Sequence, residues 1–311
     1  MNSRQPLPPQ LQGRAFSVGE ALSLGVHPDR LRASDLAKPF HGARLPAGVD
    51  GGTGHLSLCR AYLPALPPNG YFSHASAAAI MGIPLPARVA RSTVIHVSLP
   101  PGSRGVRTRD VAGHVLDAGP HDLRMWGDLP LTGPERTWCD LAGALSLRQL
   151  VAAGDHLIHH RQPLTTPHEL RAAVDRFAGH RGVRALRAAL PLLSDRAESP
   201  AESELRVVLA LAGLPTPLVN HEIRTRTGRF IARVDLLFPE NRLVVEYQGD
   251  HHRTDQKQWR RDLARAAELE SERYRVTEVT ADDLRSEPAL IARIRRLLSF
   301  PVPLSRHESG V

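Results

Sequence analysis

The sequence lacks any long apolar run. Its 311 residues contain no stretch of about 18 consecutive apolar side chains, the length that a membrane-spanning helix needs. The first residues, MNSRQPLPPQLQGR, also lack the apolar segment of a secretory signal. The two cysteines, Cys59 and Cys139, are far apart, and neither has a second cysteine at metal-ligand spacing. These absences predict a cytoplasmic protein with buried free thiols and no membrane contact.

Lysine is also scarce, because Lys38 and Lys257 are the only lysines among 40 basic residues. Arginine bias can reflect a GC-rich coding genome, so the preference for arginine is not informative by itself. The formal net charge of +8 is informative, since an excess of positive charge favours a polyanionic partner such as DNA. Arg104, Arg107 and Arg109 form a basic turn, which is either a solvated loop or a phosphate-contacting loop.

The length of the chain predicts two or three domains rather than one. Boundaries are expected at the glycine-rich residues 51–54 and at the polar segment DRAESP, residues 195–200. The expected fold class is multidomain α+β, or mixed α/β. From the N-terminus we expect a disordered tail (1–13), a winged-helix-like helical module (14–50), an α+β middle region (55–195), an α/β domain with a mixed sheet (196–300) and a second tail (301–311).

The N-terminal module shows the outline of a helix-turn-helix. Ser17 is a candidate helix cap with Glu20 three residues later, and Gly25 separates this helix from a second one expected near His27. The following FHGARLPAGV, residues 40–49, is short enough to be a wing hairpin. A DNA-binding winged helix and an ordinary helical hairpin both fit this pattern.

The histidines of the middle region show no metal-ligand spacing. His74, His96, His114 and His121 are spread over the region without HxH or HxxxH patterns, and residues 159–160 are an adjacent pair. We therefore expect ordinary polar or core histidines here and no metal site.

Residues 230–253, FIARVDLLFPENRLVVEYQGDHHR, predict two strands joined by a turn at residues 239–241. Alternation places one set of apolar side chains on a shared face of the first strand: Phe230, Ala232, Val234, Leu236 and Phe238. Asp235 projects from the other face. In the second strand Glu246 and Gln248 lie opposite Leu243, Val245 and Tyr247. A carboxylate in the middle of a half-buried strand needs a cation, either an arginine or a metal.

Asp235 and Glu246 can face each other across the turn, and Glu202, from a helix after Ser199, can add a third carboxylate. Three such oxygens favour Mg²⁺ or Mn²⁺, which could polarise a phosphodiester and activate a water molecule. The adjacent His251 or His252 could then transfer a proton. Substrate phosphates could be neutralised by Arg206, Arg233, Arg253, Arg260 and Arg261. The simpler alternative is that Asp235 and Glu246 only pair with neighbouring arginines.

The last domain resembles the PD-(D/E)xK nuclease superfamily. The segments SPAESELR, VNHEI, ARVDLLFPENRLVVEYQGDHHR, RRDLARAAELE and YRVTEVTADDL are similar to very-short-patch-repair-endonuclease-like domains at the C-terminus of actinobacterial proteins, over residues 196–298. The resemblance implies a restriction-endonuclease-like fold with Asp235 and Glu246 as metal ligands and Glu202 as an accessory acid. It also implies proton transfer by His251 or His252. Gln248 stands where the superfamily usually has lysine, which puts turnover in question more than metal binding.

The N-terminal half resembles the winged-helix and companion region of AbiEi-type antitoxins, through SHASAAAIMGIP, IHVSLPPGSRG and LTGPERTWCDLAGAL. Two functions follow as hypotheses. The first is a Mg²⁺-dependent DNA endonuclease, and the second is a non-enzymatic DNA-binding regulator on a nuclease-like platform. A toxin partner and a homodimer both stay open.

Overall fold

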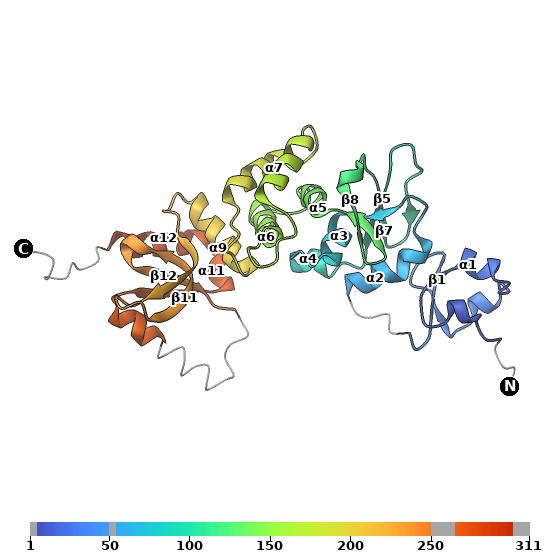
Figure 1. The fold of residues 1–311 in the computed structure, drawn as a ribbon, viewed down its shortest axis with the longest axis horizontal. Helices are drawn as coiled ribbons and strands as arrows, with labels where there is room; N and C mark the ends of the chain where they lie inside the picture. Colours follow the sequence, from blue (N-terminus) through green and yellow to red (C-terminus); the bar gives the residue numbers. More distant parts are fainter. Residues whose placement is uncertain (1–4, 50–53, 250–264, 301–311) are drawn as a thin grey trace, which may run out of the picture. The chain divides into compact units, whose positions relative to one another are not determined.

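The computed structural model describes residues 5–49, 54–249 and 265–300. The chain divides into two compact units: unit 1 comprises Met1–Ala144 and His168–Val183, and unit 2 comprises Leu145–Pro167 and Arg184–Val311. Both units mix helices with sheets, so the predicted mixed α/β class is confirmed at that level (Figure 1). Within the described ranges, no helix combines the length and the apolar character that crossing a bilayer requires.

The N-terminal part of unit 1 is a small sheet with one α-helix. The strands pair in the order β1-β3-β2, and helix α1 spans Val18–Ser23. The strand bounds are β1 Phe16–Ser17, β2 Leu36–Ala37 and β3 Ala43–Pro46. Ser17 caps α1, because its Oγ accepts a hydrogen bond from the Glu20 amide at 3.0 Å.

The second helix expected near His27 was a wrong prediction. The chain there makes only a three-residue 3₁₀ turn, Arg30–Arg32. The Arg30 guanidinium binds both carboxylate oxygens of Asp35, at 2.9 and 2.7 Å, and β2 begins at the next residue. Since the chain must enter β2 so soon, no room is left for a longer helix. The hairpin predicted at residues 40–49 is shifted: β3 lies inside this range, but its antiparallel partner β2 precedes it.

The rest of unit 1 is built on a six-stranded mixed sheet of order β6-β7-β5-β4-β9-β8. The strands are β4 Tyr71–Phe72, β5 Ile95–Leu99, β6 Arg107–Thr108, β7 Val111–Val115, β8 Leu123–Trp126 and β9 Leu129–Thr132. The helices are α2 His55–Tyr62, α3 His74–Ile80, α4 Ala87–Ala90, α5 Pro134–Leu141 and α7 Pro167–Arg176. The fully buried Phe72, Leu131 and Trp138 anchor the core.

Unit 2 contains a four-stranded sheet of order β10-β11-β12-β13. The strands are β10 Leu218–Arg224, β11 Phe230–Phe238, β12 Leu243–Tyr247 and β13 Arg275–Val279. The helices are α6 Leu147–Leu157, α8 Val183–Ala189, α9 Pro200–Leu211, α11 Ala281–Arg285 and α12 Glu287–Ser299, and residues 265–271 are also helical. The first residue of α8 belongs to unit 1 and the others belong to unit 2. The sequence had placed α6 in the middle region, but Asp155 of α6 binds Arg206 of α9.

β10, β11 and β12 form an antiparallel meander, and β13 adds a parallel fourth strand, so the sheet is mixed as the sequence predicted. β13 pairs with β12, the last strand of the meander, rather than with its middle strand β11. β11 already hydrogen-bonds to β10 on one side and to β12 on the other, so β13 joins at the outer edge of β12.

Two apolar layers cover the two faces of this sheet. On one face α9 and α12 pack through Leu209 and Ile294 on Phe238 and Val245. On the other face Leu269, from the helical residues 265–271, joins an apolar cluster with strand side chains that include Val234 and Val244.

The predicted shared face of β11 needs a correction. Leu236 and Phe238 belong to the first cluster, whereas Ala232 and Val234 belong to the second. The change occurs where Asn220 of β10, in the register position opposite Asp235, adopts a φ of 47°. A left-handed residue in a strand interrupts the regular pleat, so the simple alternation fails at Asp235.

Candidate functional site

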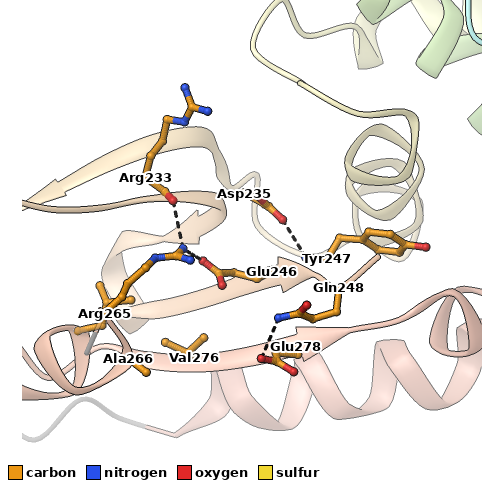
Figure 2. A pocket seen from close by; sticks show the side chains of 10 residues that line it. Arg233, Asp235, Glu246, Tyr247, Gln248, Arg265, Ala266, Val276 and Glu278 are labelled. Atoms are coloured by element: carbon orange, nitrogen blue, oxygen red, sulfur yellow. Dashed lines mark hydrogen bonds and ion pairs between the residues drawn. The ribbon is translucent and has the colours of Figure 1, made fainter. Parts of the chain in front are cut away.

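A polar cavity of about 260 Å³ lies in unit 2 between the sheet and the helical residues 265–271. Figure 2 shows how the side chains of three neighbouring strands converge on it. The lining residues are Arg233, Asp235, Glu246, Tyr247, Gln248, Arg265, Ala266, Leu269, Val276 and Glu278. Three of these carry carboxylates and two carry guanidinium groups, so charged chemistry dominates the cavity.

Asp235 and Glu246 line the same cavity, as the sequence predicted. The register pairs Leu236 with Val245, which sets Asp235 on β11 beside Glu246 on β12. An Asp235 carboxylate oxygen accepts a hydrogen bond from the Tyr247 amide at 2.8 Å. This bond fixes the Asp235 side chain across the strand pair, next to Glu246.

Burial disfavours the charged form of both carboxylates. It raises the pKa of Asp235 to about 6, and the nearby Glu202 charge adds to this while the Tyr247 hydrogen bond opposes it. Burial also raises the pKa of Glu246, against the opposing effect of Arg265. Carboxylates held in this way gain from a cation, and Arg265 supplies one by pairing with Glu246.

Two charged residues of this cavity, Arg265 and Glu278, were not predicted as site residues. Arg265 pairs with Glu246 and donates a hydrogen bond to the Arg233 carbonyl at 3.1 Å. Glu278 of β13 lies level with Glu246 in the parallel register and accepts a hydrogen bond from the Gln248 amide at 3.0 Å (Figure 2). The signal for Glu278 was present in the sequence, as a lone acid within the strand YRVTEVT, but its pairing partner was not known.

Glu202 lies outside this cavity. One of its carboxylate oxygens accepts hydrogen bonds from the Glu198 amide at 3.0 Å and from the Asn220 side chain at 2.7 Å. Among the residues that the structure describes, Glu202, Asp235 and Glu246 do not form a three-ligand metal group. Glu202 acts on Asp235 through its charge, and its assignment as a metal ligand stays a prediction.

Arg206 is corrected from a phosphate contact to a buried structural residue. It is 7% exposed, and its guanidinium binds Asp155 and the Leu192 carbonyl. Arg233 lines the cavity, but its guanidinium points away from Asp235 and Glu246 (Figure 2) and pairs with Glu198. The predicted site residues His251, His252, Arg253, Arg260 and Arg261 lie outside the described residues.

The donor set of the cavity fits Mg²⁺ or Mn²⁺. Asp235, Glu246 and Glu278 offer carboxylate oxygens, and Gln248 offers an amide oxygen, which are the types of ligand that hard divalent cations prefer. Among the described residues these three carboxylates do not form a three-ligand group, so a cation would have to draw them together. The raised pKa of Asp235 shows a carboxylate whose negative charge is poorly compensated by the protein. In the present arrangement Arg265 provides the positive charge beside Glu246.

A second cluster lies in unit 1, where three histidines that are scattered in the sequence come together. His74, His96 and His114 each bring one ring nitrogen within 4.8 Å of the others. The search for local spacings missed this group because its members come from three segments that meet only in the folded sheet.

Comparison with known proteins gives relatives in one organism. No family model matches the chain, and no solved structure matches it. Two similar proteins are "Uncharacterized protein MT2308" of Mycobacterium tuberculosis (strain CDC 1551 / Oshkosh) and "Uncharacterized protein Rv2248" of Mycobacterium tuberculosis (strain ATCC 25618 / H37Rv). Each is 34% identical over 197 residues, which cover 62% of this chain and 71% of the relative. The chain therefore belongs to the same family as these two mycobacterial proteins.

Proposed function

We propose that unit 2 is a restriction-endonuclease-like domain that hydrolyses DNA phosphodiester bonds with Mg²⁺ or Mn²⁺. The observation that carries the proposal is the pair of desolvated carboxylates, Asp235 and Glu246, on adjacent strands of one polar cavity. The layered arrangement of helices on both faces of a mixed sheet supports the fold assignment.

The residues of the chain have distinct roles in this proposal. Asp235 and Glu246 hold the cation, with Glu278 as a further oxygen donor. When bound, the cation supplies Lewis-acid chemistry to the scissile phosphate and to a water molecule. Gln248 orients that water through its amide, and Arg233, which is partly exposed beside the cavity, contacts the phosphate backbone. Proton transfer by His251 or His252 belongs to the proposal on sequence grounds.

The net charge of +8 supports DNA as the substrate. In this proposal the N-terminal module, residues 14–50, contributes further DNA contacts. We also propose, from the sequence resemblance alone, that residues 14–195 are related to AbiEi-type antitoxins.

One observation favours a second function, a DNA-binding regulator without nuclease activity. The Arg265 guanidinium already neutralises Glu246, and the Gln248 amide is held by Glu278. A domain whose carboxylates and amide are already engaged by internal pairs would still fold and bind DNA, but it would not hydrolyse it. A toxin partner would accompany this second function.

The test is a nicking assay on supercoiled plasmid with the full chain. We expect nicking with Mg²⁺ or Mn²⁺, none with EDTA, and at least a 100-fold loss in Asp235→Asn and Glu246→Gln. The matched control is Glu240→Gln, an exposed acid in the turn between the same two strands, which should cleave like wild type.

Absence of cleavage of supercoiled, mismatched and single-stranded DNA with either metal would refute the nuclease proposal. The regulator would then be supported by salt-sensitive DNA binding that both substitutions leave unchanged.

A further inference from the structure

Three neighbouring strands of unit 1 bring three histidines to one place. His96 lies on β5 and His114 on β7, and the parallel register pairs Ser98 with His114 and His96 with Ala112. The two histidines are therefore two residues apart in register and share a face of the sheet. His74 follows β4, which pairs with β5 on its other side. The strand order thus brings together three imidazoles that are 18 to 40 residues apart in the sequence.

The rings are close and nearly parallel. The His74 and His114 ring centroids are 4.0 Å apart, and those of His96 and His114 are 5.2 Å apart. His96 Nδ1 and His114 Nε2 are 3.0 Å apart. One ring nitrogen of each residue lies within 4.8 Å of the other two. A tetrahedral Zn²⁺ ion with bonds of about 2.0–2.1 Å needs ligand nitrogens roughly 3.4 Å apart, which is near the spacing present. To bind one ion, the stacked rings must rotate out of their parallel planes so that their lone pairs converge.

The three side chains are half-buried in unit 1. Each of the three side chains keeps partial exposure, which gives solvent access to the group.

His74 is also held in place by its neighbours. Its Nδ1 lies 2.9 Å from Ser73 Oγ, which in turn lies 2.6 Å from Ser98 Oγ. If Nδ1 donates to this serine pair, the lone pair of Nε2 is free to bind an ion, which is the usual arrangement around metal-bound histidine. His74 also has a φ of 50°, a strained conformation that turns this side chain at the start of α3.

The backbone beside His114 is equally constrained. A Cβ atom on Gly113 would lie 2.2 Å from the Val106 carbonyl oxygen, so β6 can approach β7 only at a glycine. This contact sets the position of the strand that carries His114.

The geometry points to a transition-metal site formed by His74, His96 and His114, with Zn²⁺ as the ion it suits best. Three imidazole nitrogens without a carboxylate select Zn²⁺, Co²⁺, Ni²⁺ or Cu²⁺ over Mg²⁺ or Ca²⁺. A water molecule completes the coordination from the exposed side. In the His96–His114 hydrogen bond, one of the two facing nitrogens carries a proton. When both nitrogens bind the metal ion, that proton moves to the other nitrogen of the same ring. The ring stays neutral, so no net proton is released.

The site is independent of the carboxylate cavity in unit 2, and its test separates the two. Untagged full chain is titrated with Zn²⁺ by calorimetry, and with Co²⁺ by visible absorption, which is intense for four-coordinate Co²⁺. We expect His96→Gln, His114→Gln and His74→Asn to lose one Zn²⁺ equivalent, or to bind it at least 100-fold more weakly. Asparagine tolerates positive φ, so His74→Asn removes the ligand while keeping the backbone conformation.

Two controls sharpen the result. His168→Ala, an exposed histidine at the start of α7 in the same unit, should bind Zn²⁺ like wild type. The double variant Asp235→Asn with Glu246→Gln should retain the same Zn²⁺ equivalent and the same Co²⁺ spectrum. The inference is overturned if wild type binds no Zn²⁺, or if His74→Asn and His96→Gln, shown to be folded by circular dichroism, bind it as wild type does.

Discussion

Separating Asp155 from Arg206 should destabilise unit 2 more than any surface substitution. Asp155 is 1% exposed, and its carboxylate accepts hydrogen bonds from Arg206 at 2.6 Å, from the Ser203 hydroxyl at 2.7 Å and from the Ser194 amide at 2.7 Å. Asp155→Ala leaves the buried Arg206 guanidinium with only the Leu192 carbonyl as an acceptor. Removing one partner of a buried ion pair costs about 3–5 kcal/mol. We expect this loss in the free energy of unfolding measured in urea.

The size of the pair interaction follows from a double-mutant cycle. Adding Arg206→Met to Asp155→Ala removes the stranded charge, so the double variant should recover about 1–3 kcal/mol relative to the sum of the single losses. The exposed pair Glu222–Arg224, 2.7 Å apart on β10, is the matched control, and Glu222→Ala should cost under about 1 kcal/mol. A loss below about 1 kcal/mol in Asp155→Ala, or additive losses in the cycle, would refute this reasoning.

Three further predictions concern the two units. Burial raises the pKa of Asp235 to about 6 in the folded metal-free protein, from about 3.9 in an unfolded chain. Between pH 4 and about 6 the folded state therefore binds more protons at Asp235 than the unfolded state does. Its stability should therefore fall by at most about 3 kcal/mol as the pH rises from 4 to about 6, and urea unfolding of Asp235→Asn should lose this dependence. Arg265→Ala removes the cation that competes at Glu246, so calorimetry should show Mg²⁺ affinity about three- to tenfold higher, and unchanged affinity would argue against competition. Gly113→Ala should lower the melting temperature of unit 1 by clashing with Val106, at a cost of about 1–3 kcal/mol, whereas wild-type stability would show that the strands can separate.

Local patterns predicted most of the elements of unit 2. The cap at Ser199, the glycine end of α9 at Gly213 and the strands on either side of residues 239–241 all follow from short-range chemistry. The pairing of Asp235 with the opposite strand was predictable for the same reason, because a short turn fixes the register.

Long-range pairing decided what the sequence could not show. Arg206 is an arginine, the residue type that often contacts phosphate groups. In the structure Asp155, 51 residues earlier, binds it in the interior. Arg265 and Glu278 follow β12 in the chain and line the cavity because β13 pairs in parallel with β12, a pairing that local patterns do not show. The three histidines of unit 1 meet for the same reason, since the order of strands in a sheet is not visible in the spacing of residues along the chain.

The central claim is that Asp235 and Glu246 hold a catalytic divalent cation. The most direct measurement is the single-turnover rate of plasmid nicking at saturating Mg²⁺ for wild type and Asp235→Asn, with DNA binding measured in parallel. The account predicts at least a 100-fold lower rate for Asp235→Asn with DNA affinity preserved. Equal rates for the two proteins, or no metal-dependent nicking by wild type, would contradict it.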